Sequence, residues 1–219
     1  MNILSRLLDI VLPYHCLGCG DLGSPLCKSC TGKLPLAEKH ASSWINGFFS
    51  YKYPATKDTI QHLKKYPNQM LIKTLVEESS YELACILSDK VLFGTFKDPI
   101  LVPIPIHYSR FLSRGYNQSE YIAKALHEKL SEGWNTEYNS TLLVKTKKTQ
   151  KQALITEKSL RLAAPKGSVA VRREAQNLLA GRDVVLIDDV ATTGATLAAA
   201  KVALLQSGAR HVIAFTIAH

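Results

Sequence analysis

The sequence predicts an α/β protein with a doubly wound parallel sheet. Residues 184–187 and 212–217 are uninterrupted apolar runs, the pattern of parallel strands that are covered on both faces. A helical segment lies between them at 197–205, and another at 116–130 repeats apolar residues every fourth position. Strands that alternate with helices in this way build parallel sheets, which is why we expect this fold class.

Length and composition limit the class of protein. With 219 residues, the chain can form one α/β core and a smaller appendage. The apolar segment 3–12 contains Arg6 and Asp9, so we expect neither a membrane span nor a signal peptide, and we expect a cytoplasmic location. The net charge of +9 is typical of a protein with a polyanionic partner, although a basic chain can also simply be more soluble.

The pattern divides the chain into three predicted domains. These are a small module with four cysteines at 1–43, a connecting or hood-like region at 44–99 and an α/β domain at 100–219. In the connecting region we expect a strand at 48–53 and helices at 56–65 and 69–92. In the α/β domain we expect strands at 100–102, 141–144, 169–171, 184–187 and 212–217.

Four cysteines near the N-terminus have the spacing of a metal site. Cys16, Cys19, Cys27 and Cys30 form two C-x2-C pairs, whose thiolates can bind one zinc ion tetrahedrally. The alternative is two disulfides, which the cytosolic character of the rest of the chain disfavours. Because four thiolates leave no open coordination position, we expect a structural zinc that supplies folding energy.

The strand at 184–187 is followed by residues suited to a phosphorylated sugar. Asp188 and Asp189 come at its carboxyl end, the edge where open α/β sheets bind ligands. The next helix then begins with small and hydroxyl residues, where backbone N–H groups bind anions: Ala191, Thr192, Thr193, Gly194, Ala195 and Thr196. A phosphate there would place the carboxylates beside sugar hydroxyls. The simpler interpretation, a turn capped by Thr193, does not explain two adjacent acids.

A second polar segment follows the strand at 100–102. We expect Arg110 and Arg114 in a polar loop, where guanidinium groups suit a pyrophosphate. The pyrophosphate-side candidates are Pro103, Ile104, Pro105, Arg110 and Arg114. The alternative is a rigid connection with solvent-facing arginines, and His107 is given no catalytic role.

Basic residues are concentrated in the stretch from 145 to 173. Its candidates for nucleic-acid contact are Lys145, Lys147, Lys148, Lys151 and Arg161. Such a stretch predicts contact with a polyanion, which could be a small ligand, a nucleic-acid backbone or both. A solvated loop is the alternative interpretation.

The apolar strand, the acid pair and the sequence TTGAT resemble the motif that binds phosphoribosyl pyrophosphate (PRPP) in type I phosphoribosyltransferases. Together with the four cysteines, VPIPIH, RGYNQSE and the T-x-x-Q of Thr149 and Gln152, they resemble the competence protein ComF family over nearly the whole chain. Members combine a zinc-binding N-terminal module with a phosphoribosyltransferase-like domain. The family is associated with the uptake and handling of transforming single-stranded DNA in bacteria.

The resemblance implies roles for these residues. Asp188 and Asp189 would hold the ribose hydroxyls, residues 191–196 the 5′-phosphate, and residues 103–107 would face the pyrophosphate, with Mg²⁺ bridging mostly ligand oxygens. Residues 145–161 match the place of the flexible catalytic loop. No hood for a nucleobase is obvious before the core, unless residues 44–65 form one.

These features lead to three functional hypotheses. The first is a PRPP-binding accessory protein that handles single-stranded DNA during natural transformation. The second is an active phosphoribosyltransferase, in which a nitrogen nucleophile such as a nucleobase attacks the anomeric carbon as pyrophosphate leaves. The third is a non-catalytic scaffold that docks a helicase or another competence protein, although the complete acid pair argues against it.

Overall fold

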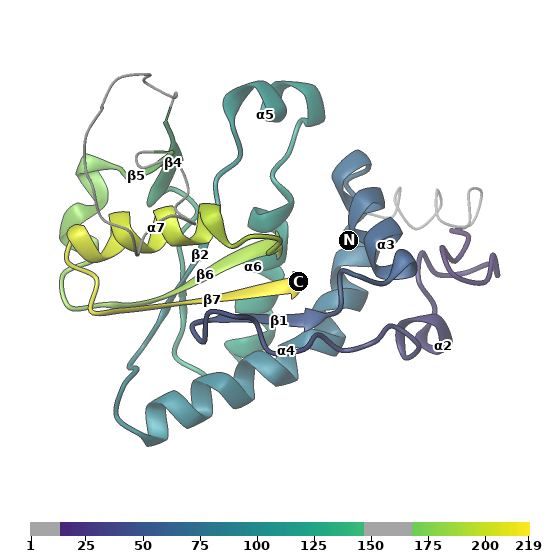
Figure 1. The fold of residues 1–219 in the computed structure, drawn as a ribbon, viewed down its shortest axis with the longest axis horizontal. Coiled ribbons are helices and arrows are strands. Elements are labelled where there is room, and N and C mark those ends of the chain that lie inside the picture. The colour runs from purple at the N-terminus through teal and green to yellow at the C-terminus, as the bar shows by residue number, and fades with distance from the viewer. Residues whose placement is uncertain (1–13, 147–167) are drawn as a thin grey trace.

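The structure is a computed structural model that describes residues 14–146 and 168–219. Its centre is a parallel five-stranded sheet with the order β1-β7-β6-β2-β3 (Figure 1). The strands are β1 (Ile45–Phe49), β2 (Ile100–Pro103), β3 (Glu137–Tyr138), β6 (Asp183–Val190) and β7 (His211–Ala218). The parallel α/β sheet that the sequence predicts is thus confirmed.

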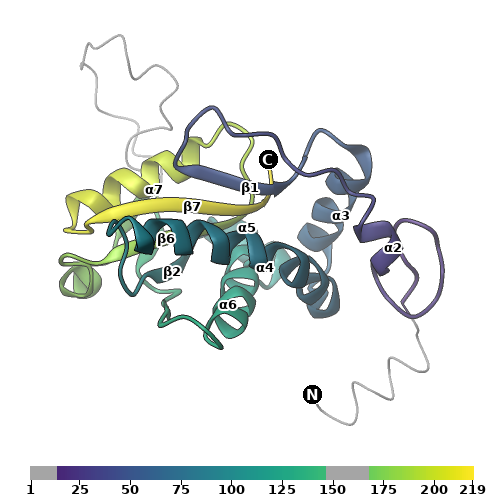
Figure 2. The same cartoon turned by 90° about the horizontal axis from the view of Figure 1, so that it is seen from below.

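Helices cover both faces of the sheet. Figure 2 shows α7 (Ala195–Gln206) on one face, and α4 (Gln69–Leu92) and α6 (Gln118–Leu130) on the other. A buried apolar cluster lies on each face of the sheet, and the apolar residues of β6 belong alternately to the two clusters. This follows because successive strand residues point to opposite faces. Val185 and Ile187 belong to the cluster with α4 and α6, whereas Val184 and Leu186 belong to the cluster with α7.

The two crossover connections diverge at the carboxyl ends of β2 and β6. After β2 the chain crosses through α6 to β3 on one face, and after β6 it crosses through α7 to β7 on the other face. The two strands are neighbours, with Pro103 opposite Ile187. Ligands of open α/β sheets bind where the crossovers diverge in this way. The acid pair of β6 follows directly after Ile187 at this edge.

The predicted polar loop after β2 was wrong, because the segment contains a helix. This helix, α5, spans Tyr108–Arg114 and carries both Arg110 and Arg114. The ring nitrogen of His107 accepts a hydrogen bond from the backbone N–H of Ser109 and caps the helix start. Gly115 ends it with a φ of 78°, a conformation that glycine adopts without strain. These local signals outweigh the polar composition that predicted a loop.

Several predicted strands are shifted or paired differently. β1 lies at Ile45–Phe49 rather than 48–53, and it joins β7 in the main sheet. The expected strands at 141–144 and 169–171 appear as β4 (Leu143–Lys145) and β5 (Val169–Val171), but they pair with each other antiparallel in a separate two-stranded sheet. They are therefore not strands of the main sheet. The short strand β3 was not predicted.

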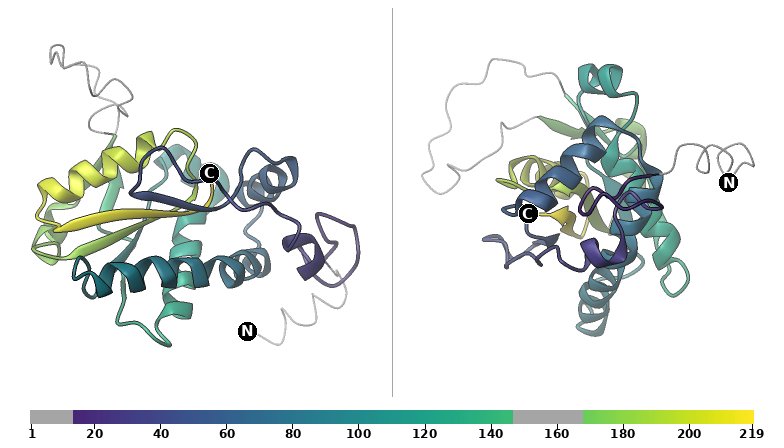
Figure 3. Two further views of the ribbon diagram at one scale, coloured as in Figure 1. Left: turned by 60° about the horizontal axis from the view of Figure 1, so that its bottom comes forward. Right: turned by 90° about the vertical axis from the view of Figure 1, so that its right-hand side faces the viewer.

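The remaining elements connect the N-terminal region to this core. They are α2 (Lys28–Thr31), α3 (Pro54–Lys65) and the 3₁₀ helix η1 (Arg173–Leu178). Figure 3 shows α2 and its flanking turns at the end of the molecule beyond α3, away from α7. Leu26 and Leu34 of this region belong to the same buried cluster as Leu63 of α3. Among the helices of the described residues, none is long and apolar enough to cross a membrane.

Candidate ligand and metal sites

The acid pair lies at the carboxyl end of β6 and is largely buried. Asp188 Oδ1 accepts a hydrogen bond from Ser119 Oγ at 2.7 Å and another from its neighbour's backbone N–H at 2.9 Å. Asp189 is only 7% exposed, and its Oδ2 lies 3.2 Å from Lys64 Nζ. Charges that are buried in this way are usually paired, so α3 supplies the cation that one of the two carboxylates requires.

The environment of Asp188 favours its protonated form. Burial, followed by the nearby charge of Asp189, raises the pKa of Asp188 from its ordinary value of 3.8 to about 7. The hydrogen bonds from Ser119 and from the backbone oppose this shift, as does the charge of Lys64. The ligand-free site therefore disfavours two full negative charges. A group that brings hydrogen-bond donors or a cation to this edge would relieve that cost.

The turn after the acid pair is shaped by Gly194. This residue has a φ of 66° and stands at the N-cap of α7. A Cβ at this position would lie 2.7 Å from Ile45 Cδ1, so the turn packs closely on β1. Ala191 is buried and donates its N–H to the carbonyl of Ala218, whereas Thr192 and Thr193 are exposed. Ala195 and Thr196 lie in the first turn of α7, where the backbone N–H groups have no partner within the helix, and the N–H of Ala195 donates to Thr193 Oγ1 at 3.4 Å.

The strand exit at β2 is fixed beside the acid pair. Pro103 pairs with β6, and Ile104 continues the pairing by donating its N–H to the carbonyl of Ile187 at 2.8 Å. The carbonyl of Ile104 accepts from Asn117 Nδ2 at 3.0 Å. Pro105 follows, half-buried. The same Asn117 caps α6 through its side-chain oxygen, so one residue fixes both the strand exit and the helix that carries Ser119.

Lys145 is brought to the ligand edge, with Arg110 near it. The pKa of Lys145 is lowered by burial and by the charge of Arg110, while Asp188 acts against this shift. Asp188 and Arg110 each lie within electrostatic range of Lys145. Arg114 is half-buried at the end of α5. The other basic candidates, Lys147, Lys148, Lys151 and Arg161, lie outside the described residues, as do Thr149 and Gln152 of the T-x-x-Q sequence.

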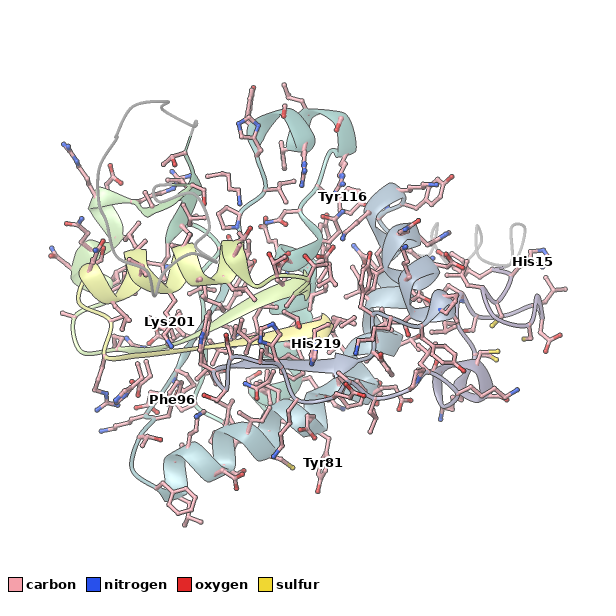
Figure 4. All side chains as sticks on the ribbon, viewed as in Figure 1. His15, Tyr81, Phe96, Tyr116, Lys201 and His219 are labelled. Carbon is pink, nitrogen blue, oxygen red and sulfur yellow. The ribbon has the colours of Figure 1, made fainter. Side chains whose placement is uncertain are left out.

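Two contributors to this site were not identified as functional from the sequence. Ser119 belongs to the RGYNQSE sequence but carries no signal of its own, and Lys64 carries none because its partner is distant in the chain. Tyr116, labelled in Figure 4, donates its hydroxyl to the carbonyl of Leu63 and ties α3 to the segment before α6. The region 44–65 therefore reaches the carboxyl edge of the sheet through α3.

The four cysteines converge on one point. The Sγ atoms of Cys16, Cys19, Cys27 and Cys30 all lie within 4.8 Å of one another. Zinc–sulfur bonds of about 2.3 Å in a tetrahedron separate the sulfurs by about 3.8 Å, and Cys19 Sγ and Cys27 Sγ are 3.8 Å apart. The donor set and its spacing fit zinc, and no disulfide links the described cysteines.

The backbone around the cysteines is adapted to sulfur. The N–H groups of Gly18 and Cys27 donate to Cys16 Sγ at 3.4 and 3.3 Å. A Cβ on Gly18 would lie 2.7 Å from Cys30 Sγ, so only glycine fits there. Burial acts to raise the pKa of the Cys16 thiol, but the backbone N–H groups outweigh it and lower the pKa to about 6. The thiolate form that binds metals is thus favoured.

Comparisons with known proteins match this geometry. The phosphoribosyl transferase domain family matches residues 117–219, which include the acid pair and the N-terminus of α7. The chain is 29% identical over 162 residues to competence protein ComFC of Bacillus subtilis (strain 168). It is 33% identical over 112 residues to DNA utilization protein YhgH of Escherichia coli (strain K12). These matches support a ComF-family protein with a phosphoribosyl transferase domain.

The matches to these relatives are partial. The alignments cover 74% and 51% of this chain but only 58% of ComFC and 45% of YhgH. The aligned region thus spans about half the length of the curated relatives. The family model supports a phosphoribosyltransferase-like domain over residues 117–219, and the four cysteines lie close enough together to hold a metal ion.

Proposed function

We propose that the chain is a PRPP-binding accessory protein that handles single-stranded DNA during bacterial natural transformation. The observation that carries the proposal is the buried acid pair at the end of β6, followed at once by the N-terminus of α7. Vicinal ribose hydroxyls can donate to the two carboxylates while the 5′-phosphate accepts from N–H groups of α7. The printed names of the relatives, competence and DNA utilization, support the biological role.

In this proposal each side of the acid pair meets a different part of the ligand. Asp188 and Asp189 hold the ribose, and residues 191–196 hold the 5′-phosphate. The pyrophosphate would lie toward Ile104, which follows β2 and bonds to Ile187, and toward Arg110 and Lys145. Mg²⁺ bound with PRPP would supply charge neutralisation, and carboxylate oxygens are ligands that it accepts.

The cysteine cluster is proposed to hold one structural zinc ion. Four sulfur donors leave no coordination position for a substrate, so the ion would contribute to folding and not to chemistry. Its bound cysteines would fix the turns on both sides of α2 against Leu26 and Leu34.

An active phosphoribosyltransferase is the second candidate function, and the position of α3 favours it. Lys64 reaches Asp189, and Leu63 accepts from Tyr116, so α3 lies beside the sheet edge where an acceptor would be held. A nitrogen nucleophile would form a bond to the anomeric carbon, and the carbon–oxygen bond to pyrophosphate would break with its electron pair leaving on oxygen. The chain would contribute orientation and charge stabilisation.

Two assays separate these candidates. Thermal shift with PRPP, ribose 5-phosphate and pyrophosphate, each with Mg²⁺, should show stabilisation by PRPP and by ribose 5-phosphate. Pyrophosphate release should then be measured with PRPP and either free nucleobases or single-stranded DNA. Release with one acceptor selects the enzyme, and binding without release selects the accessory protein. Stabilisation by neither sugar phosphate would refute the ligand and leave the scaffold.

A further inference from the structure

A cavity lies outside the acid-pair site, between α5, the first turns of α6 and β3. Its volume is about 370 Å³, within the range of small-molecule pockets. Four aromatic rings line it, and they come from different parts of the chain: Phe111, Tyr116, Tyr121 and Tyr138. Such a concentration of rings around a single cavity fits a flat aromatic ligand.

Two of the rings remain available to a ligand. Phe111 is 43% exposed and Tyr121 is 37% exposed, although both line the cavity. Tyr116 is buried, and its hydroxyl is held by the carbonyl of Leu63, so its ring is fixed as one wall. It meets Tyr121 edge to face, with 6.1 Å between the ring centroids. The rings thus form a preformed wall with open faces, which keeps the entropic cost of binding low.

The cavity also contains one acceptor and one donor. Glu120 and Lys124 line it from successive turns of α6, and neither forms an ion pair with another described residue. The charge of Glu120 contributes to the raised pKa of Tyr138, although burial of that phenol is the larger cause. A carboxylate can accept from the amino group of a base, and an ammonium can donate to a base carbonyl.

The helix above the cavity carries cations and exposed rings. None of the residues of α5 is buried, and Figure 1 shows the helix projecting from the sheet. Arg110 and Arg114 lie on it together with the exposed ring of Tyr108. Guanidinium groups beside aromatic side chains are the combination that binds a phosphate backbone and its unstacked bases.

We propose that this cavity binds one unpaired base of a single-stranded DNA, of which a flanking phosphate contacts Arg114. The inference rests on the proposed handling of single-stranded DNA and assigns it a surface within the described residues. Asn117 lines the cavity, and Ser119 on the same turn of α6 bonds to Asp188. The base site and the acid pair are therefore on two sides of one helix N-terminus.

The test compares ring-free variants with a matched control. Phe111→Leu and Tyr121→Leu keep an apolar side chain but remove the stacking face. Tyr81→Leu is the control, because Tyr81 is 77% exposed on α4 and is labelled far from α5 in Figure 4. Fluorescence anisotropy with a labelled single-stranded 12-mer should show each cavity variant binding about tenfold more weakly than wild type. Tyr121→Phe should bind like wild type, as should Tyr81→Leu.

A base analogue reports directly on stacking. A strand that contains 2-aminopurine should lose fluorescence when wild type binds it and keep that fluorescence with Phe111→Leu. A strand with abasic residues should bind more weakly than the intact strand, and free deoxynucleosides should not compete at equal concentration. Competition by a deoxynucleoside as strong as by the strand would overturn the assignment to a DNA strand.

The outcomes separate this inference from the proposed function. If wild type binds no single-stranded DNA at low salt, the DNA role and the cavity assignment both fail. If wild type binds the strand and the two ring-free variants bind it equally well, the DNA role stands and the cavity assignment is overturned. Circular dichroism of each variant, with Tyr121→Phe as the conservative reference, shows that a loss of binding is not a loss of fold.

Discussion

Replacing Asp188 by asparagine should stabilise the ligand-free protein while weakening the proposed ribose site. The carboxylate uses Oδ1 to accept from Ser119 Oγ and from the backbone N–H of Asp189. An asparagine side-chain oxygen can accept both bonds in the same place. The substitution therefore keeps the geometry and removes only the charge that burial and Asp189 oppose.

The magnitude and the sign follow from the raised pKa. The Asp188 pKa rises from 3.8 to about 7 on folding, so the folded state binds the proton more tightly than the unfolded chain. Stability is unaffected by this group below pH 3.8 and falls as the pH rises toward 7. Each pKa unit is worth about 1.4 kcal/mol, so ionised Asp188 costs about 4 kcal/mol above pH 7. Asp188→Asn should recover about 4 kcal/mol at pH 8 and about 2 kcal/mol at pH 5.5.

Urea unfolding of zinc-loaded protein at these two pH values measures the effect. Asp183→Asn is the matched control from the other end of β6. Burial acts to raise the pKa of Asp183, but Arg210, the Lys97 backbone N–H and His211 outweigh it and lower the pKa. Ionised Asp183 therefore stabilises the fold at any pH above the pKa that this residue has in the unfolded chain. This stabilisation is lost only as the pH falls through the lower pKa of the folded state, so Asp183→Asn should destabilise the protein at both pH 5.5 and pH 8. The reasoning would be refuted if Asp188→Asn raised the free energy of unfolding equally at pH 5.5 and pH 8, or lowered it at pH 8.

Three further predictions concern the metal, the glycine turn and the basic stretch. Elemental analysis should find one zinc ion per chain, and Cys16→Ser should lower the midpoint temperature of thermal unfolding. A wild-type protein that is stable without zinc when prepared under reducing conditions would contradict the site. Gly194→Ala should cost about 1–3 kcal/mol because of its positive φ and the close Ile45 methyl, whereas Gly133→Ala, with no atom near its Cβ, should change stability little in the same urea assay. Replacing Lys147, Lys148 and Lys151 together should flatten the salt dependence of single-stranded DNA binding, which is about 0.7 log units per phosphate; an unchanged slope would remove these lysines from the DNA surface.

The parts of the fold that were predictable from sequence have local signals. The apolar runs of β6 and β7 require burial on both faces, and the helix at 69–92 was predicted with its observed bounds. The spacing of the four cysteines in the sequence was enough to predict that their sulfur atoms lie together. The helix α5 was missed because its composition is mostly polar, although His107 and Gly115 form caps at its two ends.

The missed parts depend on pairings distant in the chain. β1 joins β7 across more than 160 positions, and no local pattern distinguishes a main-sheet edge strand from a short isolated one. The strands at 143–145 and 169–171 look like sheet strands locally, yet they pair with each other. Likewise, Lys64 meets Asp189 only because α3 folds over the sheet edge. The acid pair could be found from sequence, whereas its protein partners could not.

The most direct test of the proposed ligand is calorimetric titration of PRPP with Mg²⁺ into wild type and into the double variant Asp188→Asn, Asp189→Asn. Charge-assisted hydrogen bonds contribute about 1.5–3 kcal/mol each, so the double variant should bind PRPP at least about tenfold more weakly. Urea unfolding of the double variant supplies the control that it is folded. Wild-type affinity for PRPP in a folded double variant would contradict the assignment of the acid pair to the ribose.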